Sequence, residues 1–173
     1  VGIGGGAACT TCIVTGFEIR QFTAIRECAE IAHKLRVPLI ADGGIKQSRD
    51  VVLALAAGAS TVMVGKLFAL TQESAAEKTY DETNTLVAKY RGQASEDFQN
   101  EYYGGLKVKT VAEGTAYTAP VSGSAQKLID DLLGGIRSGM TYGGARSIKE
   151  LQRKAEFVEV TSTYMTESFP RPR

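Results

Sequence analysis

The chain has 173 residues, of which 43% are hydrophobic and 23% charged, a composition typical of a globular protein with one domain. Its 20 basic residues nearly balance 19 acidic ones without any basic run, so we expect neither nucleic acid nor an anionic membrane as a partner. No apolar stretch approaches the length of about 18 residues that a membrane span needs, and the N-terminus lacks the features of a signal peptide. The cytoplasm is therefore the expected location.

The first half of the chain alternates between helical patterns and short apolar runs, after a glycine-rich opening loop at residues 1–16. Residues 21–37 carry apolar side chains at steps of three and four, and residues 48–59 combine a serine cap, an apolar run and a glycine stop; both patterns predict helices. A short run follows each helix, at residues 38–44 and 61–65, and both read as apolar strands buried on two faces. Strands and helices that alternate at this spacing predict βαβ units and a parallel sheet.

The second half of the chain is less regular. Residues 66–89 are polar and compatible with a helix, whereas residues 90–123 have no sustained period, so we expect a mobile functional flap there. Serine caps predict helices at residues 124–140 and 147–155. A strand-like run at residues 155–161 and an extended tail at 167–173 end the chain. Two or three strands can neither close a parallel sheet nor be covered on both faces, so residues 1–173 look like part of one larger domain.

Two glycine-bearing turns predict a phosphate site. ADGGI (residues 41–45) and VMVGK (62–66) each place glycine where a strand ends and a helix begins, so that close backbone approach and free amides favour an anion. Either turn alone could be a simple connection, but the pair fits the phosphate position that follows the last two strands of a TIM barrel. Asp42 could accept hydrogen bonds from a ribose diol, or it could make an Asx turn.

Cys9 follows GIGGGAA, a segment so poor in side chains that it must turn tightly and can direct backbone carbonyls at a cation or amides at an anion. Its thiolate could be a nucleophile, and the alternative is a small buried hydrophobic residue. Cys9 and Cys12 also form a C-x-x-C pair, which could indicate a redox dithiol or half a zinc site. The chain has no second C-x-x-C, and its one histidine, His33, lies in a predicted helix as a solvated residue, so we expect neither function and treat Cys12 as incidental.

Taken together and in order, the motifs GIGGGAACTT, IVTG, ADGGI, VMVGK, YRG, AEG, LGGIRSGMTYGGA and KAEFVEVT resemble those of the IMP dehydrogenase and GMP reductase family. The resemblance covers essentially the whole chain. It implies a longer TIM (β/α)8 barrel, of which this chain would supply strands seven and eight, the active-site flap and the C-terminal elements. The N-terminal half of the barrel would come from the same or a separate chain, and a homotetramer is the implied assembly.

The resemblance also assigns roles to individual residues. Cys9 matches the nucleophile that attacks C2 of the purine, and Thr11 and Glu113 match the pair that handles the ammonia proton in the GMP reductase branch. Asp42 matches the ribose-binding carboxylate. The further residues implied in substrate binding are Gly43, Gly44, Gly65, Lys66, Tyr90, Gly92, Gln93 and Gly114. The backbone carbonyls of Gly4, Gly6 and Cys9 would bind a monovalent cation, potassium.

The interval from Gly92 to Glu113 favours one branch of the family, because it is short and contains no arginine, as in GMP reductase. That branch uses NADPH to convert GMP to IMP and ammonia through a covalent cysteine–purine intermediate. Gln93, Ala94 and Thr110 depart from its usual residues, and TESFP near the C-terminus resembles the dehydrogenase tail. IMP dehydrogenase, which converts IMP to XMP with NAD, is therefore the alternative. A non-catalytic protein that binds purine nucleotides is a second alternative.

Overall fold

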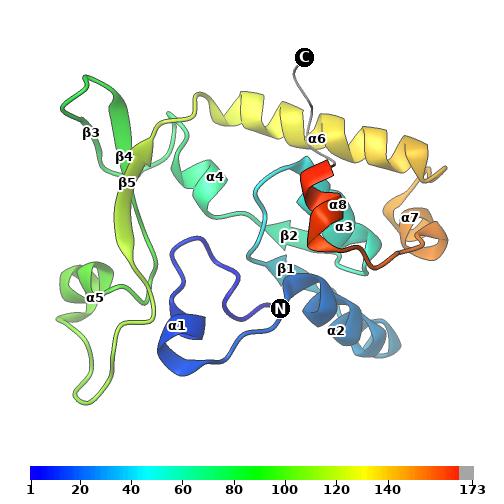
Figure 1. The fold of residues 1–173 in the computed structure, drawn as a ribbon, viewed down its shortest axis with the longest axis horizontal. Coiled ribbons are helices and arrows are strands. Elements are labelled where there is room, and N and C mark those ends of the chain that lie inside the picture. Colours follow the sequence, from blue (N-terminus) through cyan, green and yellow to red (C-terminus); the bar gives the residue numbers. More distant parts are fainter. Residues whose placement is uncertain (168–173) are drawn as a thin grey trace.

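The computed structural model describes residues 1–167, which form two small sheets and the helices around them (Figure 1). The helices are α1 Thr11–Thr15, α2 Gln21–Leu35, α3 Ser48–Ala56, α4 Lys66–Ala69, α5 Glu96–Tyr103, α6 Ala125–Tyr142, α7 Ile148–Lys154 and α8 Ser162–Glu167. The strands are β1 Ile40–Asp42, β2 Thr61–Met63, β3 Lys78–Tyr80, β4 Leu86–Arg91 and β5 Ala116–Pro120. Within this part of the chain, no helix is long and apolar enough to cross a membrane.

The predicted βαβ unit is present. Strands β1 and β2 pair in parallel, with Ala41 opposite Val62, and α3 connects them. One face of this strand pair packs on α2 and α3 through a hydrophobic cluster. Ile25 of α2 belongs to this cluster and is only 1% exposed. Gly58 follows α3 at a φ of 118°, and a Cβ there would lie 2.4 Å from that of Ala29, so glycine lets the two helices meet.

The other side of these strands differs from the prediction that both faces are buried. Ile40 of β1 is 47% exposed and Met63 of β2 is 51% exposed. Ala41, which follows Ile40 and points to the opposite face, is fully buried. Side chains of a strand alternate between faces, so one face of β1 and β2 meets the helices and the other carries apolar residues that nothing in residues 1–167 covers.

Helices α6 and α7 follow their predictions, including the serine caps. Ser124 accepts a hydrogen bond from the amide of Lys127, and Ser147 accepts one from the amide of Glu150. The predicted Ser48 cap of α3 is wrong, because Gln47 takes the N-cap position and forms a capping box with Asp50. A second core cluster joins these three helices, with Leu151 4% exposed.

A helix over residues 66–89 was the wrong expectation. Only Lys66–Ala69 is helical, and the rest leads into an antiparallel sheet with the order β3-β4-β5. The carboxylate of Asp81 stabilises the turn between β3 and β4, because its Oδ1 accepts hydrogen bonds from the amides of Thr83 and Thr85 at 2.9 Å. Asn84 adopts a left-handed φ of 59° in this turn.

The flap predicted at residues 90–123 is not structureless. It starts within β4 and contains both α5 and β5, and Arg91 pairs with Ala116 across β4 and β5. The two strands therefore form a base from which residues 92–115 extend (Figure 1).

The predicted strand at residues 155–161 is also absent, because these residues pair with no other strand and their backbone is irregular. Phe157 instead packs edge-on against Phe22 at 4.8 Å between ring centroids, with the guanidinium of Arg26 5.9 Å from both rings. The predicted extended tail at residues 167–173 lies outside the described residues except for Glu167, which ends α8.

Candidate active site

The cysteine loop and the flap are joined by a short backbone ladder. Thr10 donates its amide to the carbonyl of Glu113 at 2.9 Å, and Thr115 donates to Ala8 at 2.9 Å, so that Cys9 and Gly114 form an antiparallel bridge. The amide of Glu113 donates in turn to the carbonyl of Ala94 at 3.1 Å. These hydrogen bonds hold residues 8–10 of the cysteine loop beside residues 113–115 of the flap, although the two segments are distant in sequence.

Glycine is needed where these segments cross. A Cβ on Gly114 would lie 2.9 Å from the amide nitrogen of Ser95, and one on Gly92 would lie 3.1 Å from the carbonyl oxygen of Ala8. A Cβ at 2.9 Å from backbone would force the chain to shift, and one at 3.1 Å would make an unusually tight contact, so glycine at both positions lets the cysteine loop, the end of β4 and the start of β5 converge. The two predicted substrate-binding glycines therefore also have a structural role.

A pocket of about 430 Å³ opens at this crossing. Cys9, Thr11 and Glu113 all line it, so the structure brings together the three residues predicted to be catalytic. The Cys9 thiol donates a hydrogen bond to the Thr11 hydroxyl at 3.2 Å, and both side chains are partly buried. Tyr90, Gly92, Gln93 and Gly114 line the same pocket. A nucleophile, a hydroxyl and a carboxylate around one cavity can support covalent and acid–base chemistry.

The predicted phosphate residues gather in a second, adjoining pocket of about 100 Å³. Asp42, Gly43, Gly44, Gly65 and Lys66 line it, and Gly6 and Tyr90 line both pockets. The two glycine turns therefore face one space, as predicted from their positions after parallel strands. The amide of Gly44 is not free, however, because it donates to the carbonyl of Gly5 at 2.9 Å. An anion held by that amide would have to displace this bond.

Tyr90 connects the two pockets. A Cβ on Gly65 would lie 3.1 Å from the Tyr90 hydroxyl, so the hydroxyl covers the glycine that precedes α4. Burial raises the pKa of Tyr90, and Tyr117 and Asp42 add to this effect, so the phenol stays protonated and able to donate. The ring packs edge-on against Tyr117 at 5.6 Å, and the Lys66 ammonium lies 5.2 Å from the Tyr117 ring.

Asp42 is exposed at the end of β1, and its carboxylate accepts no hydrogen bond from the described residues. The Asx turn that was the alternative to ribose binding is therefore not formed. The carboxylate is free to accept hydrogen bonds from hydroxyl groups of a ligand.

In the part of the chain that the structure describes, the cysteines belong to no side-chain cluster that could ligate a metal ion. Among the described residues, no group of three or more histidine, cysteine, aspartate or glutamate side chains could hold a metal ion. Cys9 and Cys12 are free thiols, and a hydrogen bond with Glu18 raises the pKa of the Cys12 thiol, which disfavours its thiolate form. The Gly6 carbonyl accepts the amide of Cys9 at 3.1 Å, so one of the three carbonyls predicted for potassium already has a partner.

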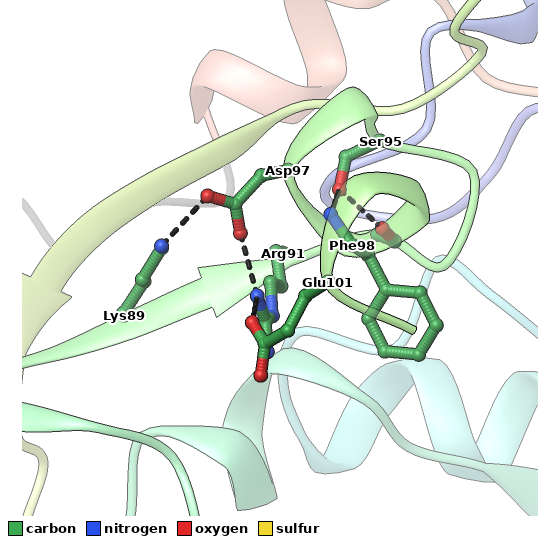
Figure 2. Close-up of polar contacts among 7 residues, drawn as sticks. Lys89, Arg91, Ser95, Asp97, Phe98 and Glu101 are labelled. Carbon is green, nitrogen blue, oxygen red and sulfur yellow. Dashed lines mark hydrogen bonds and ion pairs between the residues drawn. The ribbon is translucent and has the colours of Figure 1, made fainter. Parts of the chain in front are cut away.

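Some residues around the pocket were missed by sequence reasoning. Gln99 of α5 lines it and donates its side-chain amide to the carbonyl of Gln93 at 2.8 Å. On the same helix, Asp97 and Glu101 form ion pairs with Arg91 of β4 (Figure 2). A helix signal was present, because Ser95 is followed by two acidic residues, a typical N-cap and first turn.

Residues 1–171 match the IMP dehydrogenase / GMP reductase domain family. The chain belongs to this family. An inosine-5'-monophosphate dehydrogenase of Aquifex aeolicus (strain VF5) is 46% identical over an alignment of 167 positions, which covers 93% of this chain and 34% of that protein. The homologous dehydrogenase of Helicobacter pylori (strain ATCC 700392 / 26695) is 44% identical over 97% of this chain and 36% of its own length.

Among solved structures, a GMP reductase variant from Trypanosoma brucei in complex with guanosine 5'-monophosphate superimposes with a TM-score of 0.92. It is 34% identical to this chain, and the match covers 99% of this chain and 36% of that one. The α/β fold is therefore similar to that of GMP reductase, and the chain spans about a third of the length of the relatives it matches. The family resemblance seen in the motifs is confirmed, and the family consists of oxidoreductases of purine nucleotides.

Proposed function

We propose that this chain is the C-terminal part of the TIM-barrel catalytic domain of a GMP reductase-like enzyme, which converts GMP to IMP and ammonia. The observation that carries the proposal is the convergence of Cys9, Thr11 and Glu113 on one pocket next to the glycine-lined space around Gly65. The short flap without arginine and the similarity to a GMP reductase structure support the same branch.

The nucleotide would span both pockets. Its phosphate would lie in the smaller space, near the Gly65 turn and within reach of the Tyr90 hydroxyl, and the Asp42 carboxylate would accept hydrogen bonds from the ribose. The base would then reach the larger pocket beside Cys9. Lys66 would turn from the Tyr117 ring toward the phosphate as a point charge.

The chemistry follows from the three side chains at the base. The Cys9 thiolate attacks C2 of the purine and forms a carbon–sulfur bond, and the 2-amino nitrogen leaves as ammonia after Glu113 and Thr11 deliver a proton to it. When bound, the nicotinamide cofactor supplies the hydride that C2 gains as the carbon–sulfur bond breaks and the thiolate is released. Leu106 and Val111 give the larger pocket an apolar wall suited to a flat ring, and Lys107 beside them suits an anionic cofactor.

IMP dehydrogenase is the second candidate, because the two relatives described above carry that name at 46% and 44% identity. The complete gene product should be assayed with GMP plus NADPH and, separately, with IMP plus NAD. Turnover of the first pair is expected. Turnover of the second pair alone would assign the dehydrogenase activity, and nucleotide binding without turnover of either pair would leave a binding protein.

A further inference from the structure

Arg91 is the centre of a cluster that holds α5 against β4 (Figure 2). Its Nη1 donates to Asp97 Oδ2 at 2.6 Å and to Glu101 Oε2 at 2.5 Å. Lys89, two residues earlier on the same strand face, donates to the other oxygen of Asp97 at 2.7 Å. The two carboxylates are four residues apart and so lie on one face of α5, one helical turn from each other. Strand β4 therefore forms ion pairs with α5 at two successive turns.

Two aromatic rings complete this cluster. Phe98 and Tyr102 of α5 stack at 4.6 Å with 24° between their planes, and the Arg91 guanidinium lies 5.3 Å and 5.5 Å from their centroids. The side chain is only 20% exposed. A planar guanidinium with two carboxylates and two rings around it fixes both the rotation and the height of α5, which a single flexible ion pair would not do.

The orientation of α5 matters to the pocket because of Gln99, which lies on the same helix. Gln99 lines the larger pocket and donates to the Gln93 carbonyl at 2.8 Å, while its own backbone carbonyl accepts the amide of Gly105 at 2.9 Å. At the start of the helix, buried Ser95 donates its hydroxyl to the Gly92 carbonyl at 2.6 Å. A continuous set of contacts thus runs from Arg91 to the wall of the pocket beside Cys9.

We propose that Arg91 is a positioning residue of the nucleotide site: by holding α5 on β4, it sets the Gln99 carboxamide and the residue 92–95 turn against the purine base. Arg91 does not line the pocket, so it acts through Gln99 and not by contact with the ligand. The inference rests on the proposed function, since it requires that the larger pocket receives a purine.

The test compares Arg91→Met, Arg91→Lys, Gln99→Ala and the double variant Arg91→Met/Gln99→Ala in the complete gene product. Arg91→Met is expected to raise the KM for GMP about tenfold while kcat changes much less, because a displaced wall weakens binding of the base. Arg91→Lys, which keeps the charge, should recover part of this loss. With Gln99 already absent, Arg91→Met should raise KM by clearly less than it does alone.

Hydrogen exchange gives a second readout that does not depend on turnover. Amides of residues 96–105 should exchange faster in Arg91→Met, whereas those of α6 should not change. Lys127→Met is the matched control, because Lys127 forms an exposed ion pair with Asp131 at 2.8 Å on α6, far from the pocket in sequence and lining none of it. It should leave KM, kcat and α5 exchange unchanged.

The outcomes separate this inference from the proposed function. If the wild-type protein neither binds nor converts GMP or IMP, the proposed function fails and the positioning role fails with it. If the wild type converts GMP but Arg91→Met leaves KM unchanged, or its effect simply adds to that of Gln99→Ala, Arg91 does not position the site. A lower thermal midpoint with unchanged KM would mean that the cluster only stabilises the fold.

Discussion

Cys9 and Glu113 lie far apart in the sequence, and two backbone hydrogen bonds bring them to one pocket. Their chemistry could be inferred from the motifs around them, but the sequence contains no signal for the bonds from Thr10 to Glu113 and from Thr115 to Ala8, because any residue can make a backbone bond. The sequence therefore indicates which residues belong to the candidate site, but it does not indicate which segments lie next to them in the fold. Arg91 is the clearest example, because its partners are ordinary charged and aromatic residues of a segment expected to be irregular.

Replacement of Cys9 by serine tests the nucleophile. We expect Cys9→Ser to lower turnover of GMP by on the order of a thousandfold or more, because an alcohol is far less ionised than a thiol, while GMP binding measured by calorimetry changes little. Cys12→Ser is the control, since this thiol contacts Glu18 and lies outside the larger pocket. Near-normal turnover in Cys9→Ser would refute the covalent mechanism.

Glu113 is tested by an amide of nearly the same shape. Glu113→Gln should reduce deamination of GMP by on the order of a hundredfold, because glutamine cannot deliver the proton that the leaving nitrogen needs. Binding should persist, since the main-chain bonds of residue 113 remain. Glu96→Gln, also in the flap but in the exposed first turn of α5, should have no effect on the rate. Equal rates for the two variants would leave Glu113 without an acid–base role.

At the scale of elements, local sequence predicts four of the helices and the parallel strands β1 and β2, but it does not predict the antiparallel strands β3, β4 and β5. Short-range patterns suffice for four helices, because apolar residues at suitable positions indicate α2 and α3, and serine caps mark the starts of α6 and α7. Strand β3, with the sequence KTY, has no apolar alternation, and β4 is held by β5, which follows only after α5 and a long turn. Such pairing depends on distant residues, and this explains why residues 66–89 were expected to be helical.

The adjacent glycines Gly134 and Gly135 of α6 give a prediction about stability in which one position serves as the control for the other. A Cβ on Gly135 would lie 2.2 Å from the side chain of Ser48 on α3, whereas one on Gly134 would have nothing within 4 Å. Gly135→Ala should therefore lower the free energy of unfolding by about 1–3 kcal/mol. Gly134→Ala should raise it by about 0.5–1 kcal/mol, because alanine favours the helix. Chemical denaturation measures both, and a loss of similar size in the two variants would contradict the packing seen between α3 and α6.

The Arg91 cluster predicts a dependence of α5 on pH. Hydrogen bonds from Lys89 and Arg91 lower the pKa of Asp97, and one from Arg91 lowers the pKa of Glu101. Groups whose pKa is lowered on folding stabilise the fold at pH values above their ordinary pKa, and this contribution is lost as the pH falls through the lowered value. Hydrogen exchange of α5, corrected for its intrinsic rate, should thus be constant between about pH 5 and 7 and accelerate below about pH 4. Asp97→Asn combined with Glu101→Gln should give fast exchange throughout this range, and an unchanged profile would exclude the cluster as the cause.

At the scale of the whole molecule, the two faces of the β1–β2 pair differ sharply. Ala41 is covered by α2 and α3, but Ile40 and Met63 are about half exposed on the opposite face. Apolar side chains on both faces are typical of parallel strands inside an α/β barrel. This asymmetry agrees with a chain that spans 34–36% of the length of its relatives, and we propose that the rest of the barrel covers the exposed face.

Polar substitutions on that face test the completed barrel. In the complete gene product, Ile40→Ser and Met63→Ser should each lower the free energy of unfolding by about 2–4 kcal/mol, because each would remove apolar contacts from a covered interior and bury a hydroxyl group there. Glu30→Gln is the control, since the exposed Glu30 carboxylate of α2 pairs with Lys34 on the same helix, and its replacement should change stability by less than about 0.5 kcal/mol. Denaturant unfolding followed by circular dichroism measures all three variants. If Ile40→Ser and Met63→Ser cost no more than the control, the face is open to water in the native protein and the barrel proposal is wrong.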